Sequence, residues 1–129
     1  MRVNLQSLFA IGCGGFLGAI LRFLVSEASQ RFSKNLWFPL GTFTVNIIGC
    51  CLLGLFGGWS ENKELFSPTV RLLLMVGFLG AFTTFSTFSY ETLSLLRDQE
   101  TFYAFFNITS HIVVGLFAAW VGLTISNII

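Results

Sequence analysis

Long apolar runs alternate with short polar stretches along the whole of this chain. A helix needs about 20 mostly apolar residues to cross the hydrocarbon core of a bilayer, and four runs reach that length. The runs are Leu5 to Val25, Phe38 to Trp59, Thr69 to Leu96 and Phe102 to Ile128. The polar connections between them are too short for a second domain. The pattern predicts an all-α membrane protein in which residues 1–129 form a single domain of four transmembrane helices.

Composition agrees with a membrane protein and argues against other classes. Of the 129 residues, 54% are hydrophobic and 10% are charged, and the mean hydropathy is +0.80, which is far from a soluble domain. The net charge of +1 offers no basic excess for nucleic-acid phosphates. The chain has no nucleotide-binding glycine loop and no Ser-His-Asp set. We therefore expect a lipid bilayer around it, no nucleic-acid partner and no enzymatic activity.

The basic residues give no clear orientation in the membrane. Lys and Arg normally accumulate on the cytoplasmic side. One side of the predicted bundle carries Arg2, Lys63 and Arg71, and the other carries Arg31, Lys34 and Arg97. This balance predicts dual topology, in which the chain inserts both ways up and pairs as an antiparallel homodimer. The alternative is a single orientation set by weaker signals.

The third span contains polar residues where a lipid-facing helix would have none. Five hydroxyl residues alternate there with three phenylalanines, in the order Phe82, Thr83, Thr84, Phe85, Ser86, Thr87, Phe88 and Ser89. Polar side chains at such depth usually face the protein interior or a water-filled path. The segment therefore indicates a buried polar region or a conduction path.

Two glycines, Gly77 and Gly80, precede these hydroxyls in a span longer than the bilayer requires. We expect the third helix to be broken near its middle, which would leave carbonyl groups without intrahelical donors. A small cation is one partner for such oxygens. The alternative is that the glycines only allow close helix packing, as small residues often do in membranes.

Other residues in the spans also allow two interpretations each. Phenylalanine rings have positive edges that favour an anion, but sixteen phenylalanines in this chain make packing the simpler role. Asn46 could donate to an anion or bond a neighbouring helix. Arg22 could attract anions or extend to the interface, and Glu91 needs a partner, water or a proton. His111 has no second metal ligand at a suitable spacing, and we expect it to bond another helix.

Three motifs resemble the Fluc (CrcB) family of fluoride channels, across essentially the whole chain. They are GGFLGAILR from Gly14 to Arg22, GTFTVN from Gly41 to Asn46 and GFLGAFTTFSTFSYE from Gly77 to Glu91. The last is the most specific. The resemblance implies an antiparallel, dual-topology homodimer with two parallel fluoride pores.

The resemblance also implies roles for individual residues. Phe85 and Phe88 match paired phenylalanines whose ring edges line the pores, and Asn46 matches an asparagine that bonds fluoride or positions those rings. Further matches to the fluoride path are the hydroxyls of Ser86 and Thr87 and the charged positions Arg22 and Glu91.

A structural sodium ion (Na+) at the dimer centre is a separate implication. Gly80 and Thr83 match positions whose backbone carbonyls hold that ion. Ala81 and Phe82 depart from the family pattern without affecting these carbonyls. The fourth span fits less closely, and its polar residues Asn107, Thr109, Ser110 and His111 have no role implied by the resemblance.

The implied function is a passive fluoride-selective channel that exports cytoplasmic fluoride across the inner or plasma membrane of a prokaryote. Two alternatives remain. A small proton-coupled multidrug transporter would carry a membrane-buried glutamate in its first span, where this chain has no acidic residue before Glu27. A non-transporting accessory or scaffold subunit would need no hydroxyl residues along the third span.

Overall fold

The computed structural model describes residues 4–32, 37–62 and 65–129. Three of the basic residues in the charge balance, Arg2, Lys34 and Lys63, lie outside the described residues. The described chain is helical, with elements α1 (Leu5–Phe32), α2 (Leu40–Asn62), α3 (Pro68–Arg71), η1 (Leu72–Leu79), α4 (Gly80–Phe82), α5 (Phe85–Arg97) and α6 (Thr101–Ile128). The π-helix η1 and helices α3, α4 and α5 together form the third span.

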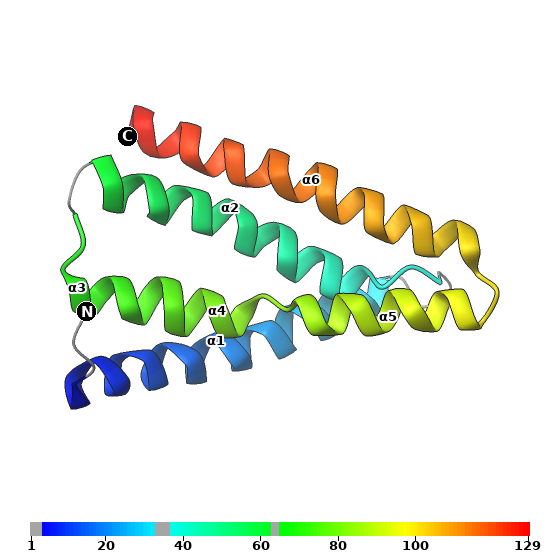
Figure 1. Cartoon of the computed structure of the whole chain (residues 1–129), viewed down its shortest axis with the longest axis horizontal. Coiled ribbons are helices and arrows are strands. Elements are labelled where there is room, and N and C mark those ends of the chain that lie inside the picture. The colour runs from blue at the N-terminus through cyan, green and yellow to red at the C-terminus, as the bar shows by residue number, and fades with distance from the viewer. Residues whose placement is uncertain (1–3, 33–36, 63–64) are drawn as a thin grey trace.

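Four helical stretches are long and apolar enough to cross a membrane: Leu5–Phe32, Leu40–Glu61, Pro68–Arg97 and Thr101–Ile128. The predicted multi-pass, all-α membrane protein with four spans is thereby confirmed. The first helix is longer than expected, because it continues from Val25 to Phe32. Polar residues such as Glu27 and Gln30 end an apolar run, but they are good helix formers and do not end a helix. Helix α1 begins and helix α6 ends at the same end of the bundle (Figure 1).

Local interactions explain where the third span begins and where it ends. Ser67 caps α3, because its hydroxyl accepts a hydrogen bond from the Val70 N–H at 3.3 Å, and Pro68 takes the first helical position. At the other end, Gln99 adopts a φ of 65° and the Glu100 N–H bonds back to the Leu95 carbonyl at 2.8 Å. This tight turn folds α6 back beside α5 (Figure 1).

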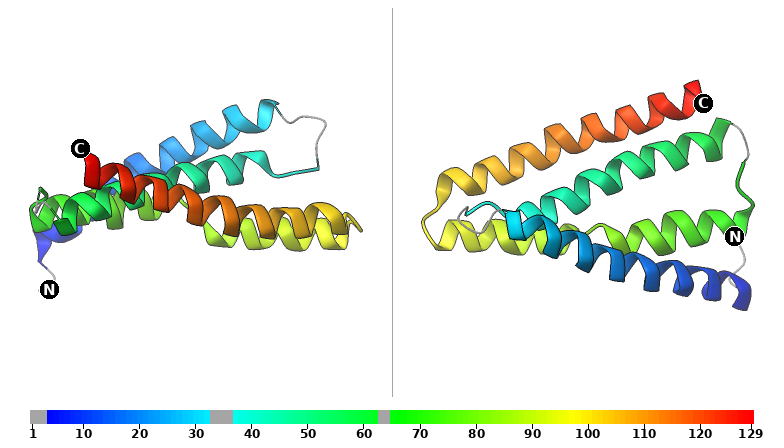
Figure 2. Two further views of the ribbon diagram at one scale, coloured as in Figure 1. Left: turned by 90° about the horizontal axis from the view of Figure 1, so that it is seen from above. Right: turned by 180° about the vertical axis from the view of Figure 1, so that it is seen from behind.

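The helices pack in two close pairs through glycine. The first half of the third span lies along α1, and α2 lies along α6 (Figures 1 and 2). A Cβ atom on Gly14 would meet the carbonyl oxygen of Leu73 on η1, and one on Gly122 would meet the carbonyl oxygen of Cys51 on α2. Lipid gives helices no hydrophobic drive to associate, so such close backbone contact is a main source of stability. These pairs hold α2 and the third span on either side of the site.

Candidate functional site

The third helix is interrupted at two threonines. Thr83 (φ −85°, ψ 157°) and Thr84 (φ −152°, ψ 114°) are extended, between the end of α4 and the start of α5. The expected interruption near the middle of the span is therefore present, but not at the glycines. Gly80 is the first residue of α4, and Gly77 lies in η1, where a Cβ atom would come within 3.1 Å of the Gly14 Cα. Gly77 thus serves close packing against α1.

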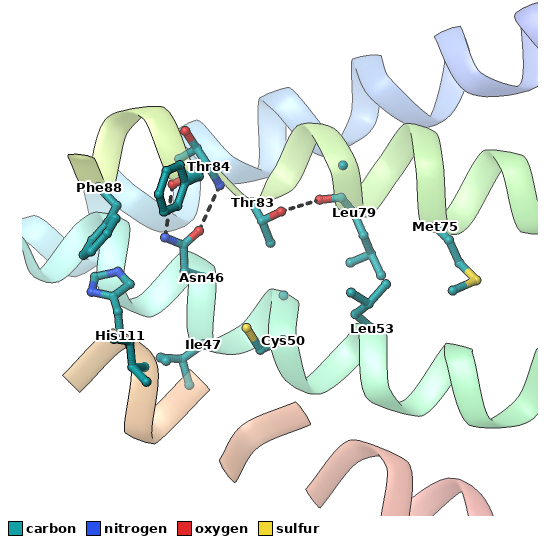
Figure 3. A pocket seen from close by; sticks show the side chains of 14 residues that line it. Asn46, Ile47, Cys50, Leu53, Met75, Leu79, Thr83, Thr84, Phe88 and His111 are labelled. Carbon is teal, nitrogen blue, oxygen red and sulfur yellow. Dashed lines mark hydrogen bonds between the residues drawn. The ribbon is translucent and has the colours of Figure 1, made fainter. Parts of the chain in front are cut away.

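Asn46 of α2 pairs with the backbone at the interruption. Its Oδ1 accepts a hydrogen bond from the Thr84 N–H at 2.9 Å, and its Nδ2 donates to the Thr84 carbonyl at 3.2 Å (Figure 3). In an unbroken helix the Thr84 N–H would bond to the Gly80 carbonyl, four residues earlier. The Thr84 N–H therefore bonds to Asn46, and the Gly80 carbonyl loses its helical donor.

Thr84 itself begins α5. Its hydroxyl oxygen accepts from the Thr87 N–H at 3.3 Å, which is the donor that the Thr83 carbonyl would have in a continuous helix. The same hydroxyl lies 3.0 Å from the Thr87 hydroxyl and 3.3 Å from that of Ser86. Gly80 and Thr83 thus both present carbonyl oxygens that have lost their intrahelical donors.

The interruption places two helix ends of opposite polarity side by side. Carbonyl groups at the end of α4 carry partial negative charge, and the N–H groups that begin α5 carry partial positive charge. Broken membrane helices use such ends to hold cations and anions, respectively. One short segment therefore offers a cation-binding end and an anion-binding end.

Two hollows adjoin the interruption. The first, of about 400 Å³, lies between α2 and the third span, and its lining includes Asn46, Gly80, Thr83, Phe85, Phe88 and His111 (Figure 3). The second, of about 450 Å³, lies between α5 and α6, and its lining includes Ser89 and Thr92. Phe85, Phe88 and Ile112 line both hollows. These three side chains therefore separate one hollow from the other.

The two phenylalanine rings differ in exposure. Their centroids lie 5.6 Å apart with the rings tilted by 45°. Phe85 is 79% exposed on the single chain, whereas Phe88 is half-buried against His111, with ring centroids 4.5 Å apart. Phe88 is therefore fixed by contacts within the chain, and Phe85 is not.

The remaining predicted site residues lie apart from the first hollow. Ser86 and Thr87 are exposed at the start of α5, next to the Thr84 hydroxyl. Glu91 accepts a hydrogen bond from the Thr42 hydroxyl at 2.7 Å, and its buried Oε2 has no hydrogen-bond partner within residues 4–32, 37–62 and 65–129. Arg22 is half-buried on α1 and lines neither hollow. Within one chain the structure brings together Asn46, Gly80, Thr83, Phe85 and Phe88.

Sequence reasoning missed two polar contributors from the helices around Phe88. His111 lines the first hollow and Thr92 the second. His111 was visible as the chain's only histidine, and it was expected to bond another helix. Its Nδ1 lies instead 2.9 Å from the backbone carbonyl oxygen of Asn107, on the same helix. Thr92 gave no signal, because a hydroxyl inside a helix usually bonds a carbonyl of its own helix.

Comparison with known proteins decides the family. The family model described as "CrcB-like protein, Camphor Resistance (CrcB)" matches residues 9–123. A curated relative from Chlorobium phaeobacteroides (strain BS1), named "Fluoride-specific ion channel FluC", is 42% identical over 122 residues, which cover 95% of this chain and 94% of the relative. The chain belongs to the CrcB/FluC family of fluoride-specific ion channels. This is a channel family and not an enzyme family.

Other relatives in the family carry the same name. The protein from Methylobacillus flagellatus is 46% identical over 112 residues, covering 87% of this chain and 88% of the relative. The "Fluoride-specific ion channel FluC 1" of Methanosarcina acetivorans is 44% identical over 118 residues, covering 92% of this chain and 88% of the relative. The resemblance noted from three motifs thus extends over nearly the full chain.

Proposed function

We propose that this chain forms a passive fluoride-selective channel that exports cytoplasmic fluoride and so reduces its toxicity. The observation that carries the proposal is the Phe85–Phe88 pair, which separates two hollows next to the helix interruption. Relatives about 40% identical over nearly the full length are named fluoride-specific channels. Because fluoride enters cells as neutral HF and is trapped as the anion, a passive pore is sufficient. An inside-negative membrane potential favours the export of a monovalent anion by a free energy of about 2.3 kcal/mol per 100 mV.

Selectivity follows from what the path offers a dehydrating anion. Phenylalanine ring edges carry partial positive charge, and the N–H groups that begin α5 are oriented donors. The hydroxyls of Ser86 and Thr87 replace part of the water shell, while a narrow passage excludes the larger chloride. Asn46 supports the path by fixing the Thr84 backbone, and its Nδ2 retains a second proton for an anion.

An antiparallel homodimer completes the path in this proposal. Phe85, Ser86 and Thr87 are exposed on the single chain, in the middle of a membrane span. Hydroxyls at that depth need a protein surface or water against them. A second copy in the opposite orientation supplies that surface at the equivalent position. Arg22 and Glu91, which lie apart from the first hollow in one chain, would then contribute charge near the path.

A sodium ion at the dimer centre would be a partner for the carbonyl oxygens that have lost their helical donors. Gly80 and Thr83 both line the first hollow, and side chains have taken the donors of both carbonyls. Unpaired carbonyls in a membrane interior cost several kcal/mol, and hard cations bind such oxygens. Two carbonyls from each of two subunits would hold the ion, which would join the subunits.

Fluoride efflux from liposomes tests the function. Purified protein is reconstituted in vesicles loaded with fluoride or chloride, and valinomycin carries potassium to balance the charge. We expect rapid fluoride release and almost no chloride release. Slow flux coupled to protons would indicate a small multidrug-type transporter, and the absence of flux would indicate an accessory or scaffold subunit.

Exchange of the cation tests the sodium site separately. We expect the dimer to lose thermal stability when sodium is replaced by N-methylglucamine, and to recover it as sodium is titrated back. Potassium at the same ionic strength is the control. Equal stability in all three salts would contradict the sodium proposal and leave the channel proposal unaffected.

A further inference from the structure

Phe88 is attached to α6 at two points, its backbone and its ring. Both attachments lead to one buried residue, Asn107, whose exposed fraction is 0%. Phe85 has no comparable connection to α6 among the described hydrogen bonds. The arrangement distinguishes Phe88 from the other phenylalanines of the third span.

The backbone attachment runs through Thr92. The Thr92 hydroxyl donates to the Phe88 carbonyl at 2.7 Å, and the Asn107 amide Nδ2 donates to the Thr92 oxygen at 2.9 Å. A hydroxyl has one proton, which the carbonyl uses, so the amide must present its NH₂ group to Thr92. The bond joins α5 to α6 at a site where Thr92 is only 7% exposed.

The ring attachment runs through His111. Its Nδ1 lies 2.9 Å from the backbone carbonyl oxygen of Asn107, four residues earlier on α6. A carbonyl only accepts, so Nδ1 carries the proton and the neutral ring is the Nδ1–H tautomer. This bond sets the imidazole against Phe88, with centroids 4.5 Å apart and a tilt of 48°, while Phe43 packs edge-on at 5.2 Å on the imidazole. The ring of Phe88 therefore has a defined neighbour that limits its rotation.

We propose that Asn107 is a positioning residue for Phe88: its side-chain amide acts on the Phe88 backbone through Thr92, and its backbone carbonyl sets the His111 imidazole against the Phe88 ring. The inference rests on the proposed fluoride channel and adds residues of α5 and α6 to those that determine its selectivity. A phenylalanine ring attracts an anion with its edge and repels it with its face. Holding the ring in one orientation therefore favours fluoride, and releasing it weakens the discrimination against chloride.

A merely structural role would be to fasten α5 to α6. Loss of a buried hydrogen bond would then lower stability without changing which ion passes. The ratio of fluoride to chloride efflux rates separates the two roles, because it does not depend on how much protein is folded. Thr92→Ser, which keeps the hydroxyl group, separates the structural role from the positioning role further.

The first experiment compares Thr92→Val, Thr92→Ser and Thr124→Val in liposomes. Thr124 is a matched control, since its hydroxyl donates to the Trp120 carbonyl at 2.8 Å in the same way, but far from Phe88. We expect Thr92→Val to lower the fluoride-to-chloride ratio about tenfold, and Thr92→Ser and Thr124→Val to keep the wild-type ratio. An unchanged ratio in Thr92→Val, or an equal fall in Thr124→Val, would overturn the inference.

The second experiment tests the contact between His111 and Asn107 by spectroscopy, without a transport measurement. The chain has one histidine, so ¹⁵N-histidine labelling reports on His111 alone. We expect the Nδ1–H tautomer in the wild type and in Asn107→Ala, which keeps the backbone carbonyl but loses the amide. An Nε2–H tautomer in the wild type would overturn the ring attachment. A wild-type protein that passes no fluoride contradicts the channel proposal instead, and the histidine spectrum still tests the ring attachment.

Discussion

The phenylalanines of the third span have different surroundings although they lie close together. Phe82 is 3% exposed and stacks on Phe78, with ring centroids 5.9 Å apart and planes 6° from parallel. Phe88 lies between two hollows, and Phe85 is largely exposed on the single chain. Phe85 and Phe88 line both hollows beside the interruption, so at the scale of single residues they are the ones to test.

We expect Phe85→Ile and Phe88→Ile to lower fluoride efflux about tenfold each. Isoleucine keeps the apolar volume but lacks the positive ring edge, and an aromatic contact of this kind contributes up to about 1.4 kcal/mol, which corresponds to a tenfold change. Efflux from liposomes measures the effect, and size-exclusion chromatography verifies the fold. Phe9→Ile is the control, because Phe9 is 74% exposed on α1 and lines neither hollow beside the interruption. Wild-type efflux in both variants would remove these rings from the path.

Asn46 provides a second test at this scale. Asn46→Leu should lower the free energy of unfolding by about 1–3 kcal/mol, because the Thr84 N–H and carbonyl lose their partners, and should abolish most fluoride efflux. Thermal unfolding and liposome efflux measure the two effects. Asn4→Leu is the matched control: it removes the cap on the Ser7 N–H, 2.7 Å from Asn4 Oδ1, at the exposed start of α1. That change should cost about 1 kcal/mol and leave efflux unchanged.

At the scale of elements, sequence predicted the helices better than the interruption. Apolar length located all four spans, since the bilayer fixes how long a spanning helix must be. The interruption was expected from Gly77 and Gly80 in a span longer than the bilayer requires. The extended residues are instead Thr83 and Thr84, because the hydrogen bonds that replace helical ones come from Asn46, 38 residues away on α2. A contact of that separation leaves no local pattern in the sequence.

Some of the candidate site residues could be recognised from sequence motifs, and others could not. Phe85, Phe88 and Asn46 lie in specific motifs, and the structure brings them together around one hollow. Their roles in conduction stay predictions. The link from Asn107 to Phe88 could not be derived from the sequence, because it depends on how α6 is rotated against α5.

The glycine contacts between helices give a test at the element scale. Gly14→Ala should destabilise the protein by about 1–3 kcal/mol, because the new Cβ would press against the Leu73 carbonyl and lie 2.8 Å from the Phe78 nitrogen. Gly12→Ala is the control, two residues away on the same helix, where nothing lies within 4 Å of the added atom. It should be neutral or slightly stabilising through higher helix propensity. Equal denaturation midpoints for the two variants would contradict the packing of α1 against η1.

At the scale of the whole molecule, the proposed fluoride path depends on the orientation of each chain in the membrane. Phe85 and the neighbouring hydroxyls face outward at mid-membrane on the single chain. An antiparallel partner would cover them only if chains insert in both orientations. Among the described basic residues near helix ends, Arg31 and Arg97 lie towards one end of the bundle and Arg71 towards the other, where α1, α5 and α3 end (Figure 1). So small an asymmetry leaves the orientation open to one or two added charges.

We expect reporters fused to the C-terminus to give signal from both sides of the membrane. Leu65→Lys and Gln99→Lys add a positive charge at opposite ends of the bundle, so they should shift the reporter signal in opposite directions. Each variant alone would then be enriched in one orientation and form fewer antiparallel dimers, and fluoride efflux from cells should fall. Co-expression of the two restores both orientations, and efflux should recover to near the wild-type level. Signal from one side only in the wild type, or no recovery on co-expression, would show that the working channel does not need oppositely oriented subunits.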